Sequence, residues 1–221
     1  GTQYTPEKGW DENKLNMFRR HIIQLGNSGV YVIYDELEGK EAVTWGYLLH
    51  TIELPMEMKE LPNEVQVTGK NKAGGVSVAH LFSSTKTEQA IADTFFCAPT
   101  NWKNVTNAQG KTLKYPNHWH FSSTTVPCKV ARFLTVMDTH GNNRPDMKVV
   151  RNGNTVQVGD WVINCNLTEK GKAAITVTNK SEKVSLNYDA GKKEGATIVT
   201  DQIKGKQISK VLTDYLPDFE I

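Results

Sequence analysis

The sequence has few cysteines and no long apolar run. Cys97, Cys128 and Cys165 stand far apart in 221 residues, and no Cys-x-x-Cys pair occurs. This spacing argues against a zinc knuckle or a dense disulfide framework. We expect three buried thiols, with one disulfide and one free thiol as the alternative. No segment approaches the roughly 20 apolar residues of a membrane-spanning helix, so we expect no membrane span. The first residues do not resemble a signal peptide.

The sequence also lacks an excess of one charge. Its 26 basic and 24 acidic residues give a net charge of +2 and form no long like-charge blocks. Because nucleic-acid binding needs a concentration of basic residues, we expect no nucleic-acid partner. A G-x-S-x-G elbow, a P-loop and a dinucleotide fingerprint are all missing. The chain therefore carries no self-contained catalytic signature.

What the sequence does contain is a repeated strand pattern. Short β-branched or aromatic segments, bounded by Gly, Asn or Asp, recur at a spacing of about ten residues. They cover residues 18–25, 30–34, 45–51, 64–68, 75–82, 130–137, 147–151, 154–158, 160–166, 173–178 and 184–188. This pattern predicts an all-β fold with at least ten strands, arranged as an antiparallel sandwich or as stacked sheets.

Helix signals are weak and confined to two places. Thr85 and Glu88 have the spacing of a capping box ahead of residues 89–92, which favours a short helix or a turn there. Residues 208–215 fit helical spacing and an extended edge strand equally well. We expect little helix, and one β-sandwich domain over residues 1–221 with a soft boundary near the turn-forming stretch 141–146.

His50 closes the segment that follows the acidic run at residues 35–38, and the two segments resemble strands joined by a turn. Strand alternation puts His50 on the same face as Gly46 and Leu48. One interpretation is a half-buried histidine whose ring nitrogens are satisfied by backbone or by an acidic partner. The other is a zinc ligand, because neutral imidazole is a good zinc donor.

His118 and His120 form a His-x-His pair in which both rings are expected on one face of an extended segment, with Trp119 on the other. Such a pair can chelate a metal, bind a sugar carboxylate when protonated, or line a wet groove. An ordinary amphipathic strand has the same pattern. We take His118, Trp119 and His120 as candidate substrate-binding residues.

Charged residues cluster in the first two strand segments. Arg20 shares a face with Phe18 and Ile22, and its guanidinium suits a carboxylate either inside the protein or on an acidic sugar, which makes it a fourth candidate for substrate binding. Asp35, Glu36 and Glu38 are expected as solvated charges at a strand end. Paired carboxylates can also act as general acid and base when the fold sets the right separation.

The stretch from Met17 to Thr51 resembles the sheet region of heparinase II/III-like polysaccharide lyases of the Bacteroidetes type, and residues 115–121 and 131–136 are similar in character to the same region. Members of that family join an N-terminal α/α toroid to C-terminal antiparallel sheets and cleave uronate-containing polysaccharides, glycosaminoglycans among them, by β-elimination. The resemblance implies a periplasmic or secreted protein and matches His50 to a zinc histidine of the sheet domain.

The family's toroid, and the His-x-x-Asp-x-Gly-like segment that begins its sheet, are not in this sequence. The resemblance therefore implies a C-terminal β-sheet domain that forms part of the substrate cleft, binds acidic polysaccharide, pairs with its own N-terminal toroid and is inactive alone. No catalytic residue is assigned to this chain. The alternative is a stand-alone carbohydrate-binding or adhesive β-sandwich with no catalytic role.

Overall fold

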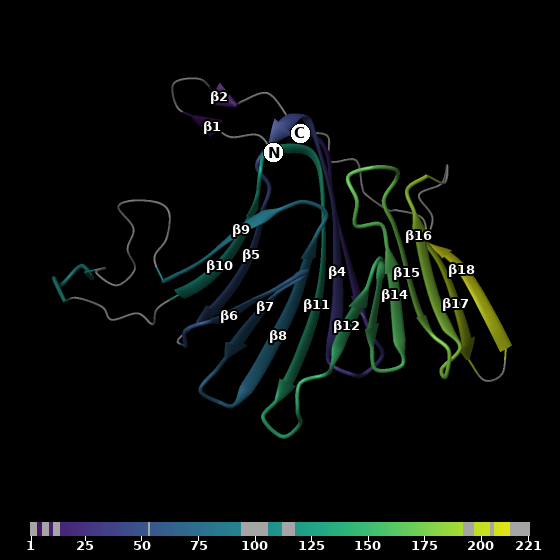
Figure 1. Cartoon of the computed structure of the whole chain (residues 1–221). Coiled ribbons are helices and arrows are strands. Elements are labelled where there is room, and N and C mark those ends of the chain that lie inside the picture. Colours follow the sequence, from purple (N-terminus) through teal and green to yellow (C-terminus); the bar gives the residue numbers. More distant parts are fainter. Residues whose placement is uncertain are drawn as a thin grey trace. The chain divides into compact units, whose positions relative to one another are not determined.

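The computed structural model describes residues 4–5, 9–10, 14–52, 54–93, 106–111, 118–191, 197–203 and 206–212. All regular secondary structure in these ranges is β-strand, and every strand pairing in them is antiparallel (Figure 1). The all-β, antiparallel fold class predicted from the sequence is confirmed. The chain divides into two compact units, Gly1–Asp146 and Met147–Ile221.

The larger sheet of the first unit has six strands. Their spatial order is β3 (Leu15–Gln24), β4 (Val30–Val43), β11 (Cys128–Gly141), β8 (Gly75–Ser83), β7 (Glu64–Lys70) and β6 (Glu57–Leu61). The two long strands, β4 and β11, lie side by side near its centre, and residues 34–37 and 131–136 are buried without interruption. Because successive side chains point to opposite faces, the pleated surface is covered on both faces there.

A smaller, three-stranded sheet has the order β5 (Gly46–Ile52), β10 (His118–Thr125) and β9 (Thr87–Ala92). A further two-stranded pair joins β1 (Tyr4–Thr5) to β2 (Gly9–Trp10). Strands β4 and β5 follow one another in sequence but do not pair. The short link between them moves the chain from the large sheet to the small one, so these segments are not a hairpin.

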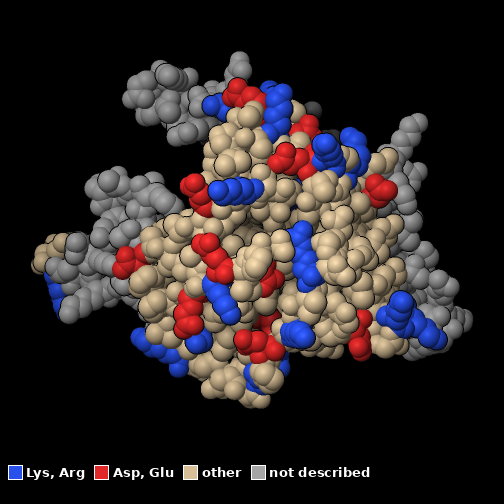
Figure 2. Space-filling model, in the orientation of Figure 1, with Lys and Arg blue, Asp and Glu red and all other residues tan. Residues whose placement is uncertain are grey.

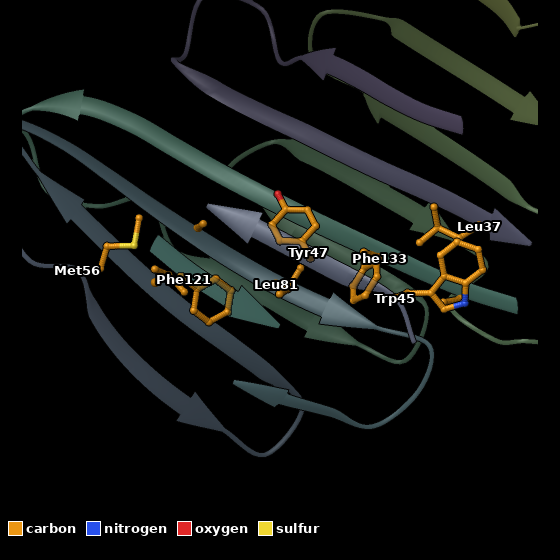
Figure 3. Packing of buried hydrophobic residues seen from close by; sticks show 10 residues of the cluster. Leu37, Trp45, Tyr47, Met56, Leu81, Phe121 and Phe133 are labelled. Carbon is orange, nitrogen blue, oxygen red and sulfur yellow. The ribbon is translucent and has the colours of Figure 1, made fainter. Parts of the chain in front are cut away.

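The core of the first unit lies between these two sheets. Tyr47 on β5 packs against Phe133 on β11 with ring centroids 5.7 Å apart. Phe121 on β10 and Leu81 on β8 belong to the same buried cluster, as Figure 3 shows. Alternation explains the arrangement, because every second side chain of a strand points to the same face. Strands β5 and β10 thus put one row of side chains into the core and leave the next row on the outer side.

Neither helix signal corresponds to a helix in the described residues. Residues 87–92 form β9, in which Ile91 lies opposite Phe121 and Gln89 lies opposite Ser123 of β10. The expected short helix or turn over residues 85–92 is therefore wrong. A strand partner supplies backbone hydrogen bonds and a half-buried place for Ile91 against the core, which outweighs a capping pattern worth about 1 kcal/mol. At the other end, residues 206–212 form an extended strand, which is one of the two alternatives left open for residues 208–215; residues 213–215 lie outside the described part.

The second unit is one antiparallel meander of seven strands in sequence order. They are β12 (Val149–Asn152), β13 (Thr155–Val158), β14 (Trp161–Cys165), β15 (Ala174–Asn179), β16 (Val184–Asp189), β17 (Thr197–Ile203) and β18 (Lys206–Leu212). Val156, Ile163 and Val177 lie opposite one another across three strands and are fully buried. One face of this sheet is therefore apolar and buried.

The border between the two units follows directly on the turn-forming stretch 141–146. Arg144 holds this stretch to the first unit, since its guanidinium donates to the Asp138 carboxylate and to the carbonyl oxygens of Ser28 and Pro145. The hydrogen bond to Asp138 raises the pKa of Arg144 above its ordinary value. The single domain with a soft boundary at 141–146 stays a prediction.

Gly29 is expected to stabilise the first unit by allowing a close approach of two backbone segments. Its φ is +77°, and an added Cβ would overlap the carbonyl oxygen of Thr139, whose backbone NH donates to the Gly29 carbonyl. Gly110 has a similar φ of +75° but open space around it. We expect Gly110→Ala to lower the free energy of unfolding by about 1–2 kcal/mol, and Gly29→Ala by about 1–3 kcal/mol more. Urea unfolding of both variants checks this; equal losses would contradict the role of the close contact.

Candidate functional site

The structure brings two of the candidate histidines together. His50 on β5 lies directly opposite His120 on β10, and their ring centroids are 6.0 Å apart. His50 is exposed, whereas His120 is only 4% exposed. The backbone of His118 pairs with Ile52, but the His118 side chain lies outside the described part. The two described imidazoles are neighbours on the face of the small sheet that points away from the core, where His50 is accessible and His120 is buried.

A zinc site needs three or four converging ligands. Within the residues that the structure describes, no group of three or more His, Cys, Asp or Glu side chains is arranged to hold a metal ion. His50 and His120 therefore supply two potential ligands and do not by themselves complete a tetrahedral set. Of the cysteines, Cys165 is buried, Cys128 is half-buried with its Sγ 3.9 Å from Oγ1 of Thr125, and Cys97 lies outside the described residues.

Trp119 does not join the two histidines. It points to the opposite face of β10, together with the fully buried Phe121, and packs half-buried against the core between the sheets. The alternation predicted for residues 118–121 is thus what separates Trp119 from His120. In this position the indole ring stabilises the sandwich and is not on the face that carries His50.

Arg20 is held by a carboxylate of the protein itself. Its Nε and Nη2 atoms donate to the two oxygens of Asp35 at 2.7 and 2.8 Å, and Asp35 is 2% exposed. The guanidinium also lies 5.4 Å from the centre of the Tyr47 ring. The hydrogen bond to Asp35 raises the pKa of Arg20, and burial raises the pKa of Tyr47. The sequence left open whether the carboxylate partner of Arg20 is inside the protein or on an acidic sugar, and the structure shows a partner inside the protein.

The acidic group at residues 35–38 is not a solvated strand end. Strand β4 continues to Val43, so these residues lie in its middle, and both Asp35 and Glu36 are buried. On the face opposite Asp35, the Glu36 carboxylate lies 2.9 Å from His21 Nε2 and 3.3 Å from Arg19 Nη1. The expectation of solvated charges was wrong for Asp35 and Glu36, because cationic side chains on the neighbouring strand compensate the cost of burying the two carboxylates. Of the three acidic residues, Glu38 alone is exposed.

A groove that was not predicted from the sequence lies beside the C-terminal end of β5. It has a volume of about 340 Å³ and is lined by Thr51, Gly69, Lys70, Asn71, Ser77 and Thr139, among others. A second hollow of about 110 Å³ shares Thr51, Gly69 and Ser77 with it and reaches His50. A Cβ at Gly69 would lie 2.6 Å from Cγ2 of Thr51. A glycine inside a strand pattern is the signal that marks this close approach.

Two comparisons with known proteins were made. A scan against protein-family models and a search of curated proteins both return no match. On the face shown in Figure 2, basic and acidic side chains are interspersed without a large area of one sign. No helix among the described ranges is long and apolar enough to cross a membrane. The class defined by the fold is thus an all-β protein of two antiparallel units.

The Arg20–Asp35 pair is expected to stabilise the first unit far more than an exposed pair does. Arg20→Ala leaves the buried Asp35 carboxylate without its partner, so we expect a loss of about 3 kcal/mol in the free energy of unfolding. Lys70→Ala removes an exposed pair with Glu57 and should cost about 0–1 kcal/mol.

Urea unfolding at neutral pH measures both losses. Adding Asp35→Asn to Arg20→Ala should recover part of the loss, because the unpaired charge is then gone. Equal losses for Arg20→Ala and Lys70→Ala would contradict this account.

Proposed function

We propose that this chain is the β-sheet part of a heparinase II/III-like polysaccharide lyase of the periplasm or cell exterior. In this proposal it forms one wall of the cleft for a uronate-containing polysaccharide, pairs with a helical toroid of the parent protein, and is inactive in β-elimination by itself.

The observation that carries the proposal is the clustering of the segments that resemble the family. Residues from 18–21, 30–35 and 131–136 lie in the neighbouring strands β3, β4 and β11 of the large sheet. Residues 46–51 and 118–121 lie in the paired strands β5 and β10 of the small sheet, which packs on the large one. The segments that resemble the family therefore all lie in the two sheets of the first unit, and His50 and His120 are neighbours on the face of the small sheet that points away from the core.

The chemistry of this histidine pair suits an acidic sugar. In β-elimination a base removes the proton next to the uronate carboxyl group, while that carboxylate is neutralised by a donor. An imidazolium ring can donate to a carboxylate, and two neighbouring rings can contact both of its oxygens. We assign the exposed His50 to contact with the uronate carboxylate, with the buried His120 beside it as the second candidate, and assign no base to this chain.

The alternative is a stand-alone carbohydrate-binding or adhesive β-sandwich. The two proposals differ in what the gene encodes upstream of residue 1. Several hundred upstream residues with amphipathic helix pairs would favour the lyase, whereas a signal peptide ending just before residue 1 would favour the stand-alone protein.

We expect the whole chain to bind soluble alginate, heparan sulfate or chondroitin sulfate in affinity gel electrophoresis at low salt. His50→Gln combined with His120→Gln should weaken that binding about tenfold or more, because hydrogen bonds to a charged group are lost. Lys59→Gln, which removes an exposed cation from β6, serves as the control and should change little.

The same chain should produce no ultraviolet absorbance of unsaturated uronate from these substrates. Turnover would show that the cleft is complete in this chain. Absence of binding to all three polysaccharides would overturn the assignment of the histidine pair.

As an alternative state of the same ring, the family resemblance leads us to propose zinc at His50 in its neutral form, in place of carboxylate binding by the protonated ring. Metal analysis of the purified protein should then find zinc, and His50→Ala should reduce the zinc content to a fraction of the original. Equal zinc content in the two proteins rules the ligand role out.

A further inference from the structure

Uncharged side chains, all of them polar except Val162, cross the more exposed face of the second unit's sheet in two rows. Strand register places four residues opposite one another from β13 to β16, and four more form the next row. The first row is Thr155, Asn164, Thr176 and Asn187; the second is Gln157, Val162, Thr178 and Ser185. All are exposed or half-buried. None carries a charge, although 23% of the chain is charged.

The two asparagines of the first row are held in position by threonines. The Thr155 hydroxyl donates to Asn164 Oδ1 at 2.5 Å, and the Thr176 hydroxyl donates to Asn187 Oδ1 at 2.9 Å. In the part of the chain that the structure describes, the Nδ2 groups of both asparagines donate to no acceptor. Two oriented amide donors are therefore available on this face, and fixing them in advance lowers the entropy cost of binding a ligand.

The first row runs into a hollow of about 270 Å³, which Asn164 and Thr176 line together with Asn154, Asn166 and Ala174. Asn166 is committed to its own turn, since its Nδ2 donates to the carbonyl oxygens of Lys170 and Lys172. Because neighbouring strands are about 4.8 Å apart, four residues in register extend the row over about 15 Å. A long ligand can lie along the row with one unit in the hollow.

The chemistry of the rows excludes most macromolecular partners. Nucleic acid and acidic polysaccharide need basic residues, and the rows contain none. Protein interfaces are enriched in aromatic residues, Met and Arg, which are missing from both rows as well. Amide and hydroxyl groups both donate and accept hydrogen bonds, as sugar hydroxyls do, while Val162 offers an apolar contact for the C–H side of a sugar ring.

We infer that this face of the second unit binds a neutral polysaccharide. The site is separate from the histidine pair of the first unit and does not depend on the proposed lyase function. Asn164 and Asn187 donate to sugar hydroxyls along the row, and the hollow beside Asn154 receives one sugar unit.

Affinity gel electrophoresis of the whole chain with neutral polysaccharides, namely a soluble β-glucan, a mannan and a xylan, tests the inference. We expect retardation by at least one of them, and a loss of about tenfold or more in affinity when Asn164→Ala and Asn187→Ala are combined. Asn142→Ala, which truncates an exposed asparagine of the first unit, should leave the affinity unchanged. Thermal unfolding of each variant confirms that the fold is kept.

Absence of binding to all three neutral polysaccharides would overturn the inference, and so would equal affinity of the wild type and the doubly substituted protein. Binding to alginate that the histidine substitutions weaken, but these asparagine substitutions leave intact, would support the proposed lyase function. If the chain binds alginate in this way but binds none of the neutral polysaccharides, the site on the second unit is rejected and the proposed lyase function is not.

Discussion

Packing of Tyr47 against Phe133 is the contact on which the first unit depends. It joins the small sheet to the large one, and Phe121 reinforces it from the next strand. Because side chains alternate along a strand, placing Tyr47 and Phe121 in the core forces His50 and His120 to the outer side. The histidine pair is thus a consequence of core packing, and its position is as rigid as the two strands that carry it.

Buried charge is the second constraint on this unit. Asp35 points toward the small sheet and Glu36 toward the opposite face of the large sheet, so adjacent residues of one strand bury carboxylates on both sides. Burying an unpaired carboxylate costs several kcal/mol, and strand β3 supplies the partners: Arg20 for Asp35, and Arg19 with His21 for Glu36. Strand β3 is therefore pinned to β4 by ion pairs as well as by backbone hydrogen bonds.

The two units offer different chemistry on the same kind of scaffold. On the first unit, paired imidazoles suit a carboxylate, while on the second unit, ordered amides and hydroxyls suit neutral sugar hydroxyls. An antiparallel sheet can present either set, because one face can stay buried while the residues of the other are free to vary.

By itself the sequence determined the fold class and most strands, because alternation of apolar and polar residues and the turn residues between them act locally. It also determined which residues share a face, and so separated Trp119 from His120. Only tertiary structure decided the strand partners. It placed β4 and β5 in different sheets, made residues 87–92 a strand and buried Asp35 beside Arg20. The pairing of His50 with His120, 70 positions apart in the chain, and the register of the amide rows depend on contacts between distant segments, and no local pattern encodes these.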